Sequence, residues 1–317
     1  MSKMPFLLMK GMASYIPGIS NLTARTKKGT ISARYCYSVW LRHLCLLFEH
    51  GFTHEQLNTI AELGPGSSLG IGLAALITGA QKYYAFDVVK NAKTDLNLQI
   101  FDQLVELFEK QEDIPDQSEF PLVNPHLGAY KFPRHILSET YFKAMLAENR
   151  IQSIRNAILN LERERSNERI QYFAPWYAGD LVQEESVDLI FSQAVLEHVN
   201  DIQQTYQTFC RWLKTGGFMS HQIDFKCHKT AEEWNGHWQY SDLMWKLITG
   251  NRPFLINRQP YSRHIDLLDQ SGLKVICEIK ATNNEGIDRK NLALPFQNLS
   301  DDDLITSGAF MISKKEF

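Results

Sequence analysis

Apolar residues fall in short blocks along residues 57–90, and the breaks between the blocks predict a strand, a turn, a helix and a second strand. Ile60–Leu63 is a short apolar run that ends at Gly64–Gly66. Leu69–Thr78 is apolar enough for a buried helix, and Gly79 is a typical helix stop. Lys82–Asp87 is rich in aromatic residues and ends on an acid, as a second strand. The stretch therefore predicts a βαβ unit with a glycine turn after its first strand.

The other apolar blocks extend this unit into a larger α/β chain. Helical periodicity or length predicts helices at Ile31–His50, Leu96–Lys110, Ser138–Asn149, Ile151–Arg165, Thr205–Leu213 and His264–Gln270. Short apolar runs predict strands at Ile170–Ala174, Val187–Ser192, Phe218–Phe225, Leu273–Lys280 and Ser307–Ser313. This alternation predicts a doubly wound α/β sheet, preceded by an N-terminal segment and covering helix within residues 1–56. Residues 57–317 then form one domain with two insertions, at about 91–168 and 226–262.

The glycine turn and the acids around it predict a nucleoside site. Residues 62–66 read E-L-G-P-G, and Gly70 follows. A dinucleotide fingerprint needs glycine at position 69, where the chain has Leu69. Asp87 follows Gly66 by 21 residues (87 − 66) at the end of the next strand, where a carboxylate can accept hydrogen bonds from ribose hydroxyls.

This pattern resembles motif I of class I S-adenosylmethionine-dependent methyltransferases. A second resemblance lies in VDLIFSQAVLEHV and WLKTGGFMSHQIDF, which are similar to the fourth and fifth strand motifs of that class. The whole chain resembles bacterial members that act in polysaccharide or small-molecule biosynthesis, with an insertion after strand two and W-N-G-H-W at residues 234–238. The resemblance implies a Rossmann-like seven-stranded sheet with its last strand antiparallel, and helical insertions that form a cap.

The resemblance also implies which residues bind the cofactor, S-adenosyl-L-methionine. They lie at the carboxyl ends of the strands: Glu62, Gly64, Gly66, Asp87, Trp176, Ser192 and Gln193. Ser192 and Gln193 are expected on the methionine side. The residue that meets adenine stays open between Asp180 and a stacking role for Trp176.

Candidate acceptor chemistry comes from histidines near the same strand ends. A hydroxyl acceptor benefits from a general base, most often histidine. The candidates are His198, after the fourth strand, and His228 and His237, in the second insertion, with Asp224 placed to orient substrate or base. His221 lies inside the fifth strand and is expected to be a core residue. No cysteine pair suggests zinc, so no metal is expected.

Composition narrows the function further. The 317 residues carry a net charge of −3, with a pI of about 6.4, which argues against a broad grip on nucleic acid. The five cysteines form no C-x-x-C pair and are expected to be reduced thiols of a cytoplasmic protein. No apolar stretch approaches the ~20 residues of a transmembrane helix.

We therefore expect a methyltransferase acting at oxygen or nitrogen of a small molecule or glycan intermediate. A nucleic-acid methyltransferase is disfavoured by the charge and by the absence of an N/D-P-P-Y/W motif. A non-catalytic S-adenosylmethionine-binding protein is the other alternative.

Overall fold

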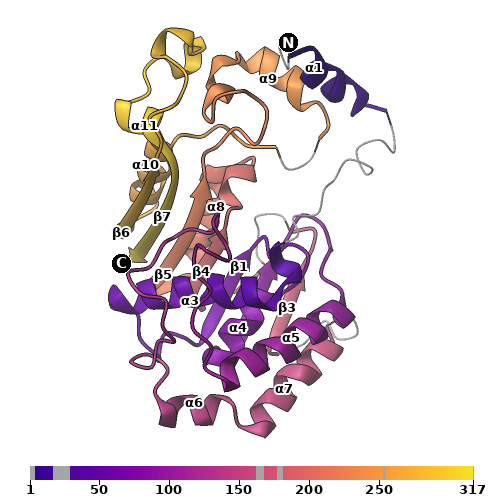
Figure 1. The fold of residues 1–317 in the computed structure, drawn as a ribbon, viewed down its shortest axis with the longest axis vertical. Coiled ribbons are helices and arrows are strands. Elements are labelled where there is room, and N and C mark those ends of the chain that lie inside the picture. The colour runs from indigo at the N-terminus through magenta and orange to yellow at the C-terminus, as the bar shows by residue number, and fades with distance from the viewer. Residues whose placement is uncertain (1–3, 17–28, 162–167, 177–180, 253–254, 317) are drawn as a thin grey trace.

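A seven-stranded sheet forms the centre of the molecule (Figure 1). The computed structural model describes residues 4–16, 29–161, 168–176, 181–252 and 255–316. The strands are β1 Thr59–Leu63, β2 Lys82–Phe86, β3 Ile170–Phe173, β4 Val187–Gln193, β5 Leu213–Asp224, β6 Leu273–Thr282 and β7 Thr306–Lys315. Their order is β3-β2-β1-β4-β5-β7-β6, so the chain crosses over next to β1 and β4.

The predicted sheet is confirmed, including its antiparallel strand. β1 to β5 pair in parallel, and β7 runs antiparallel between β5 and β6. β5 begins at Leu213, five residues before the predicted start, because Leu213 pairs with Val187 ahead of a register shift in β4. The carboxyl ends of β1, β2 and β4 lie level, since Leu63 pairs with both Phe86 and Ser192.

Helices cover both faces of the sheet, which is why its central strands are mostly apolar and buried. Every residue of β1 is buried. The helices are α1 Met4–Ala13, α3 Ala33–Glu49, α4 Gly70–Thr78, α5 Thr94–Glu109, α6 Glu139–Met145, α7 Glu148–Leu159, α8 Ile202–Trp212, α9 Asp242–Thr249, α10 Tyr261–Gln270 and α11 Asp301–Ile305. Short 3₁₀ turns are η1 Gly29–Ile31, η2 Leu196–His198, η3 Gly236–Gln239, η4 Arg289–Asn291 and η5 Leu294–Phe296. One core lies under α3, α4 and α5, and a second under α8 and α10.

Two helices of the first insertion, α6 and α7, lie at the far end of α4 from the glycine turn. Tyr141 of α6 donates a hydrogen bond to the carbonyl of Thr78 (3.1 Å), and Arg150 of α7 donates to the carbonyls of Leu76 and Ala80 (2.8 Å each). These carbonyls lie at the C-terminal end of α4, beside the start of β2. The apolar faces of α5 to α7 complete the core beside α3 and α4, on one face of the sheet (Figure 1).

The second insertion lies beyond the carboxyl ends of the strands, as the sequence predicts. There α9 packs against α1 in a small separate core of Leu7, Trp245 and Ile248 (Figure 1). Trp238 of η3 is fully buried in another small core with Ile287 and Leu292. We refer to residues 226–252 and 255–262 as the upper segment. Among the described residues, no helix is both long and apolar enough to cross a membrane.

Candidate active site

The glycine turn joins the ends of β1 and β2. Gly64 and Gly66 have φ angles of +68° and +78°, which favour glycine. The N–H of Gly64 donates to the carbonyl of Phe86 (2.7 Å), and the N–H of Gly66 donates to Oδ2 of Asp87 (3.3 Å). The fold therefore brings the predicted turn and the predicted ribose-binding acid into direct contact.

Glycine at position 64 is also required by space. A Cβ there would lie 2.6 and 2.7 Å from the two γ-carbons of Val195, in the loop after β4. The turn is thus in contact with the chain that leads directly into η2. Val195 was not singled out from the sequence, because only the crossover next to β1 and β4 makes these loops neighbours.

Asp87 is 8% exposed and keeps its carboxylate at the strand end. Its Oδ1 accepts from the N–H of Val88 (2.7 Å), while Oδ2 accepts from Gly66. Burial raises the pKa of Asp87, and the backbone donors oppose that rise. The carboxylate is therefore held in place by backbone before any ligand hydroxyl reaches it.

Glu62 is buried between β2 and the first turn of α4. It is 2% exposed, and its carboxylate accepts hydrogen bonds from the Tyr83 hydroxyl and from the backbone of Gly72. A Cβ on Gly72 would lie 2.1 Å from the Tyr83 ring, so glycine there leaves room for this contact. Burial raises the pKa of Glu62 to about 8. The Glu62 side chain therefore joins β1, β2 and α4.

Trp176, which we predicted to bind the cofactor by stacking, is packed among core side chains. Its side chain is 7% exposed, and its ring lies 5.5 Å from that of Phe86 and 6.2 Å from that of Phe209 between centroids. Phe209 and Trp176 are nearly parallel, with an interplanar angle of 15°. Apolar side chains of α8 and β2 thus enclose the Trp176 ring. Asp180, the alternative for adenine, lies outside the described residues.

Ser192 and Gln193 end β4 and point to opposite faces. The Ser192 hydroxyl lies 2.8 Å from Nδ1 of His221 in the core under α8. Gln193 Oε1 lies 3.1 Å from Nε2 of His43 on α3, and its Nε2 donates to the carbonyl of Asn124 (2.9 Å). The loop after α5 therefore reaches the carboxyl end of β4, although the helices that follow it do not. His221 is 1% exposed, so its prediction as a core residue is confirmed.

Thr30, in η1, is a neighbour of the turn that the sequence did not indicate. Its hydroxyl accepts from the N–H of Ser67 (2.9 Å), and its carbonyl accepts from the Ser68 hydroxyl. A Cβ on Gly66 would meet the same hydroxyl at 3.1 Å. No local pattern marks Thr30, because its role depends on the fold of residues 29–31 over α4.

Four polar side chains gather beyond the ends of β4 and β5, and we call them the histidine cluster: Glu197, His198, Asp224 and His228. Nε2 of His228 lies 3.3 Å from Oδ2 of Asp224, and Nε2 of His198 lies 3.7 Å from Oε1 of Glu197. The two imidazole rings are 5.1 Å apart between centroids. The sequence predicted three of these residues separately, and the fold assembles them.

Asp224 is ionised within this cluster. Burial alone would raise its pKa, but the hydrogen bond from His228 and the nearby Lys226 ammonium lower the pKa to about 2. Lys226 Nζ lies 3.4 Å from the other carboxylate oxygen of Asp224. The cluster therefore holds a fixed negative charge against an imidazole, which suits proton transfer or cation binding.

His237 lies in η3 and is 1% exposed, so it does not face bulk solvent. Its ring packs 4.7 Å from that of Trp238 between centroids, and burial, together with the charge of Arg258, lowers its pKa to about 3. His237 is thus a neutral imidazole inside the upper segment, adjacent to the cluster without belonging to it.

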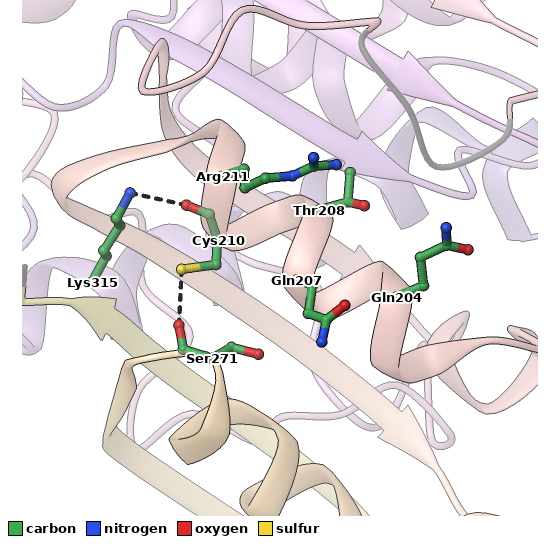
Figure 2. A pocket seen from close by; sticks show the side chains of 7 residues that line it. All are labelled: Gln204, Gln207, Thr208, Cys210, Arg211, Ser271 and Lys315. Carbon is green, nitrogen blue, oxygen red and sulfur yellow. Dashed lines mark hydrogen bonds between the residues drawn. The ribbon is translucent and has the colours of Figure 1, made fainter.

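A surface pocket elsewhere is unrelated to these residues. It is lined by Gln204, Gln207, Thr208, Cys210, Arg211, Ser271 and Lys315 (Figure 2). Lys315 Nζ donates to the carbonyls of Cys210 (3.0 Å) and Leu213 (2.9 Å), at the C-terminal end of α8. The pocket lies at the edge of the sheet opposite to the glycine turn. The ammonium group of Lys315 already donates to backbone carbonyls there.

Comparison with known proteins finds a family match over part of the chain and several solved structures of low identity. Residues 153–220 match the family described as a methyltransferase domain. Among solved structures, a SAM-dependent methyltransferase from Methanosarcina mazei is 11% identical with a TM-score of 0.42, covering 81% of this chain and 92% of that one. A phosphoethanolamine N-methyltransferase 2 from Haemonchus contortus, in complex with S-adenosyl-L-methionine, is 13% identical with a TM-score of 0.41, covering 88% and 53%.

No curated protein matches the chain. The matched family and the strand order β3-β2-β1-β4-β5-β7-β6 agree with the sequence prediction of a methyltransferase that uses S-adenosylmethionine.

Proposed function

We propose that this chain transfers the methyl group of S-adenosylmethionine to an oxygen or nitrogen of a small-molecule or glycan intermediate. One observation carries the proposal: the N–H of Gly66 lies 3.3 Å from the Asp87 carboxylate, within a turn whose two glycines have positive φ. This arrangement matches a nucleoside whose ribose meets Asp87 and whose sulfonium side passes over Gly64–Gly66.

The histidine cluster supports an acceptor site next to this cofactor site. Val195 touches Gly64 and directly precedes η2, which carries Glu197 and His198. The acceptor would therefore lie between the glycine turn and the upper segment. The net charge of −3 offers no broad basic face, which favours a small acceptor over nucleic acid.

The chemistry required of the protein is modest. The acceptor atom attacks the methyl carbon in line with the departing sulfur, so catalysis depends mainly on positioning. The acceptor proton must also leave, and we assign its removal to the histidine cluster, where Asp224 orients His228 and His198 lies adjacent. His237, buried and neutral, supports the upper segment in this proposal.

The cofactor assignment is tested by calorimetry on Asp87→Ala. The variant lacks the acceptor for ribose hydroxyls, so S-adenosylmethionine affinity should fall about 5- to 150-fold, equivalent to roughly 1–3 kcal/mol. Asp266→Ala, an exposed acid on α10, is the matched control and should bind as the wild type does. Unchanged affinity in Asp87→Ala, or tight binding of NAD instead, would contradict the proposal.

The acceptor class is tested by a screen with methyl-labelled cofactor. Nucleotide sugars, cytosolic metabolites, transfer RNA and duplex DNA form separate arms. We expect label in a small-molecule or sugar arm. Label only in nucleic acid would overturn the acceptor class, and binding without transfer in any arm would favour a non-catalytic protein.

A further inference from the structure

We propose that Glu197, His198 and His228 form a binding site for one divalent transition-metal ion, with Asp224 as the residue that orients His228. This assignment replaces the sequence expectation that no metal is bound. Binding of the ion stands on the cluster's geometry alone, whereas its part in methyl transfer rests on the proposed function.

The three residues bring their ligand atoms into one small volume. One imidazole nitrogen from each histidine and a carboxylate oxygen of Glu197 all lie within 4.8 Å of one another. Metal–ligand distances of about 2.0–2.2 Å place neighbouring ligand atoms roughly 3–3.5 Å apart. Small side-chain rotations are therefore sufficient to close the site around an ion.

The donor set selects the kind of metal. Two imidazoles and one carboxylate are typical of zinc, manganese and ferrous sites that keep open positions for water or substrate. Magnesium and calcium prefer sites made of oxygen ligands alone. Glu197 is 3% exposed, so its charge lies out of bulk water and a cation bound there is attracted strongly.

Asp224 supplies the outer contact that metal-bound histidines commonly have. It lies 3.3 Å from Nε2 of His228, and its Oδ1 also accepts from the backbone N–H of Lys226 (3.0 Å). A carboxylate that is itself anchored fixes the direction of the imidazole ring.

The backbone around the cluster is anchored on both sides. Asn257 donates from its side chain to the carbonyls of Leu196 and Val199 (2.8 Å each), and its N–H donates to the carbonyl of Glu197 (2.7 Å). On the other side, the Thr230 N–H and hydroxyl both donate to the carbonyl of Cys227. Ligands on two such braced turns are held close to their positions before an ion arrives.

In the proposed reaction the ion changes the role of the histidines from base to ligand. An acceptor hydroxyl at an open position becomes more acidic, and its proton passes to solvent. The acceptor oxygen then bonds to the methyl carbon while the carbon–sulfur bond breaks, and its electron pair stays on the sulfur of S-adenosylhomocysteine.

The test titrates the metal-stripped full chain with ZnCl₂ and separately with MnCl₂ by calorimetry. We expect one ion per chain, and at least a 10-fold loss of affinity in each of His198→Ala, His228→Ala and Glu197→Gln. His126→Ala, at an exposed histidine, is the control and should bind as the wild type does. Thermal melting confirms that each variant is folded.

A second arm measures S-adenosylmethionine affinity in the same variants. Loss of zinc affinity with unchanged cofactor affinity supports a metal site separate from the cofactor site. The inference is overturned if the wild type binds no stoichiometric ion. It is also overturned if the three folded variants bind each metal as tightly as the wild type does. If the ion binds but S-adenosylmethionine does not, the metal site stands and the proposed function fails.

Discussion

Two carboxylates, Glu62 and Asp87, lie 25 positions apart (87 − 62), one under a helix and one at a strand end, and their surroundings give them different chemistry. Asp87 is held by backbone N–H groups next to the glycine turn. Glu62 is enclosed by α4 and Tyr83, and its pKa rises to about 8. From the sequence, both carboxylates were assigned to the cofactor because both belong to the same motif. Motif spacing does not say which face of a strand a side chain occupies once the strand is fully buried.

The raised pKa of Glu62 predicts a stability that falls as pH rises. The folded chain keeps this proton up to about pH 8, whereas the unfolded chain releases it near 4.5. The stabilisation from this group is complete below about pH 4.5. Between about pH 4.5 and 8 the unfolding free energy falls by about 1.4 kcal/mol per pH unit because of this group. We expect Glu62→Gln to gain stability relative to wild type between pH 5 and 8, measured by urea unfolding. A difference that does not change with pH would contradict this.

A side chain at position 64 should destabilise the fold by a steric clash, and this effect can be separated from that of backbone strain. Gly64→Ala places a methyl group 2.6 Å from a γ-carbon of Val195 at a φ of +68°, so we expect a loss of about 1–3 kcal/mol in unfolding free energy. Gly216→Ala is the control, since it has a φ of +80° but open space around it. Adding Val195→Ala should recover part of the loss at Gly64. Equal losses in the two single variants would mean that strain alone acts.

At the scale of elements, the insertions show how packing decides position. Both were expected over the acceptor because both follow strand ends on the ligand side. Helices α6 and α7 of the first instead contact the C-terminal end of α4 through Tyr141 and Arg150. A long connection can return to any apolar surface that needs cover, and the residue at which it leaves the sheet does not determine where it packs.

The segment after β3 carries a prediction that separates core packing from ligand binding. Trp176→Ala removes a ring packed between Phe86 and Phe209, so it should cost about 3–5 kcal/mol in unfolding free energy. Trp176→Phe keeps most of the packing and should leave S-adenosylmethionine affinity unchanged in calorimetry. A clear loss of affinity in a stable Trp176→Phe would restore the stacking role.

At the scale of the whole molecule, buried imidazoles make the fold sensitive to acid. Burial lowers the pKa of His43 to about 4, and those of His221, His237 and His264 to about 3. Each lowered pKa gives a stability that is complete above about pH 6.5 and is lost as pH falls toward the folded value. Glu62 and Asp87 act in the opposite direction, but four histidines outweigh two acids.

We therefore expect the unfolding free energy to fall steeply between pH 6.5 and 4.5. Each buried histidine contributes about 1.4 kcal/mol per pH unit in that range. His264→Phe should reduce the slope of unfolding free energy against pH by the contribution of one histidine. The control variant, His126→Ala at an exposed position, should leave the slope unchanged. Urea unfolding at several pH values measures both slopes, and identical slopes in wild type and His264→Phe would contradict the assignment.

The sequence by itself determined the sheet, the glycine turn and the acid that meets it. Those features are local: an apolar run buried on both faces, glycines at positive φ, and a carboxylate at a fixed distance along the chain. The alternation of strands and helices predicted the doubly wound class of the sheet. The resemblance added the antiparallel last strand, which the register of β7 against β5 and β6 confirms.

Only the tertiary structure decided which side chains face one another. Glu62 turned under α4, Trp176 entered the core, and Thr30 and Val195 closed on the glycine turn. The meeting of His198 with His228 joins residues 30 positions apart through the pairing of β4 with β5. Contacts of this kind depend on the packing of distant elements, and the spacing of residues along one chain carries no record of them.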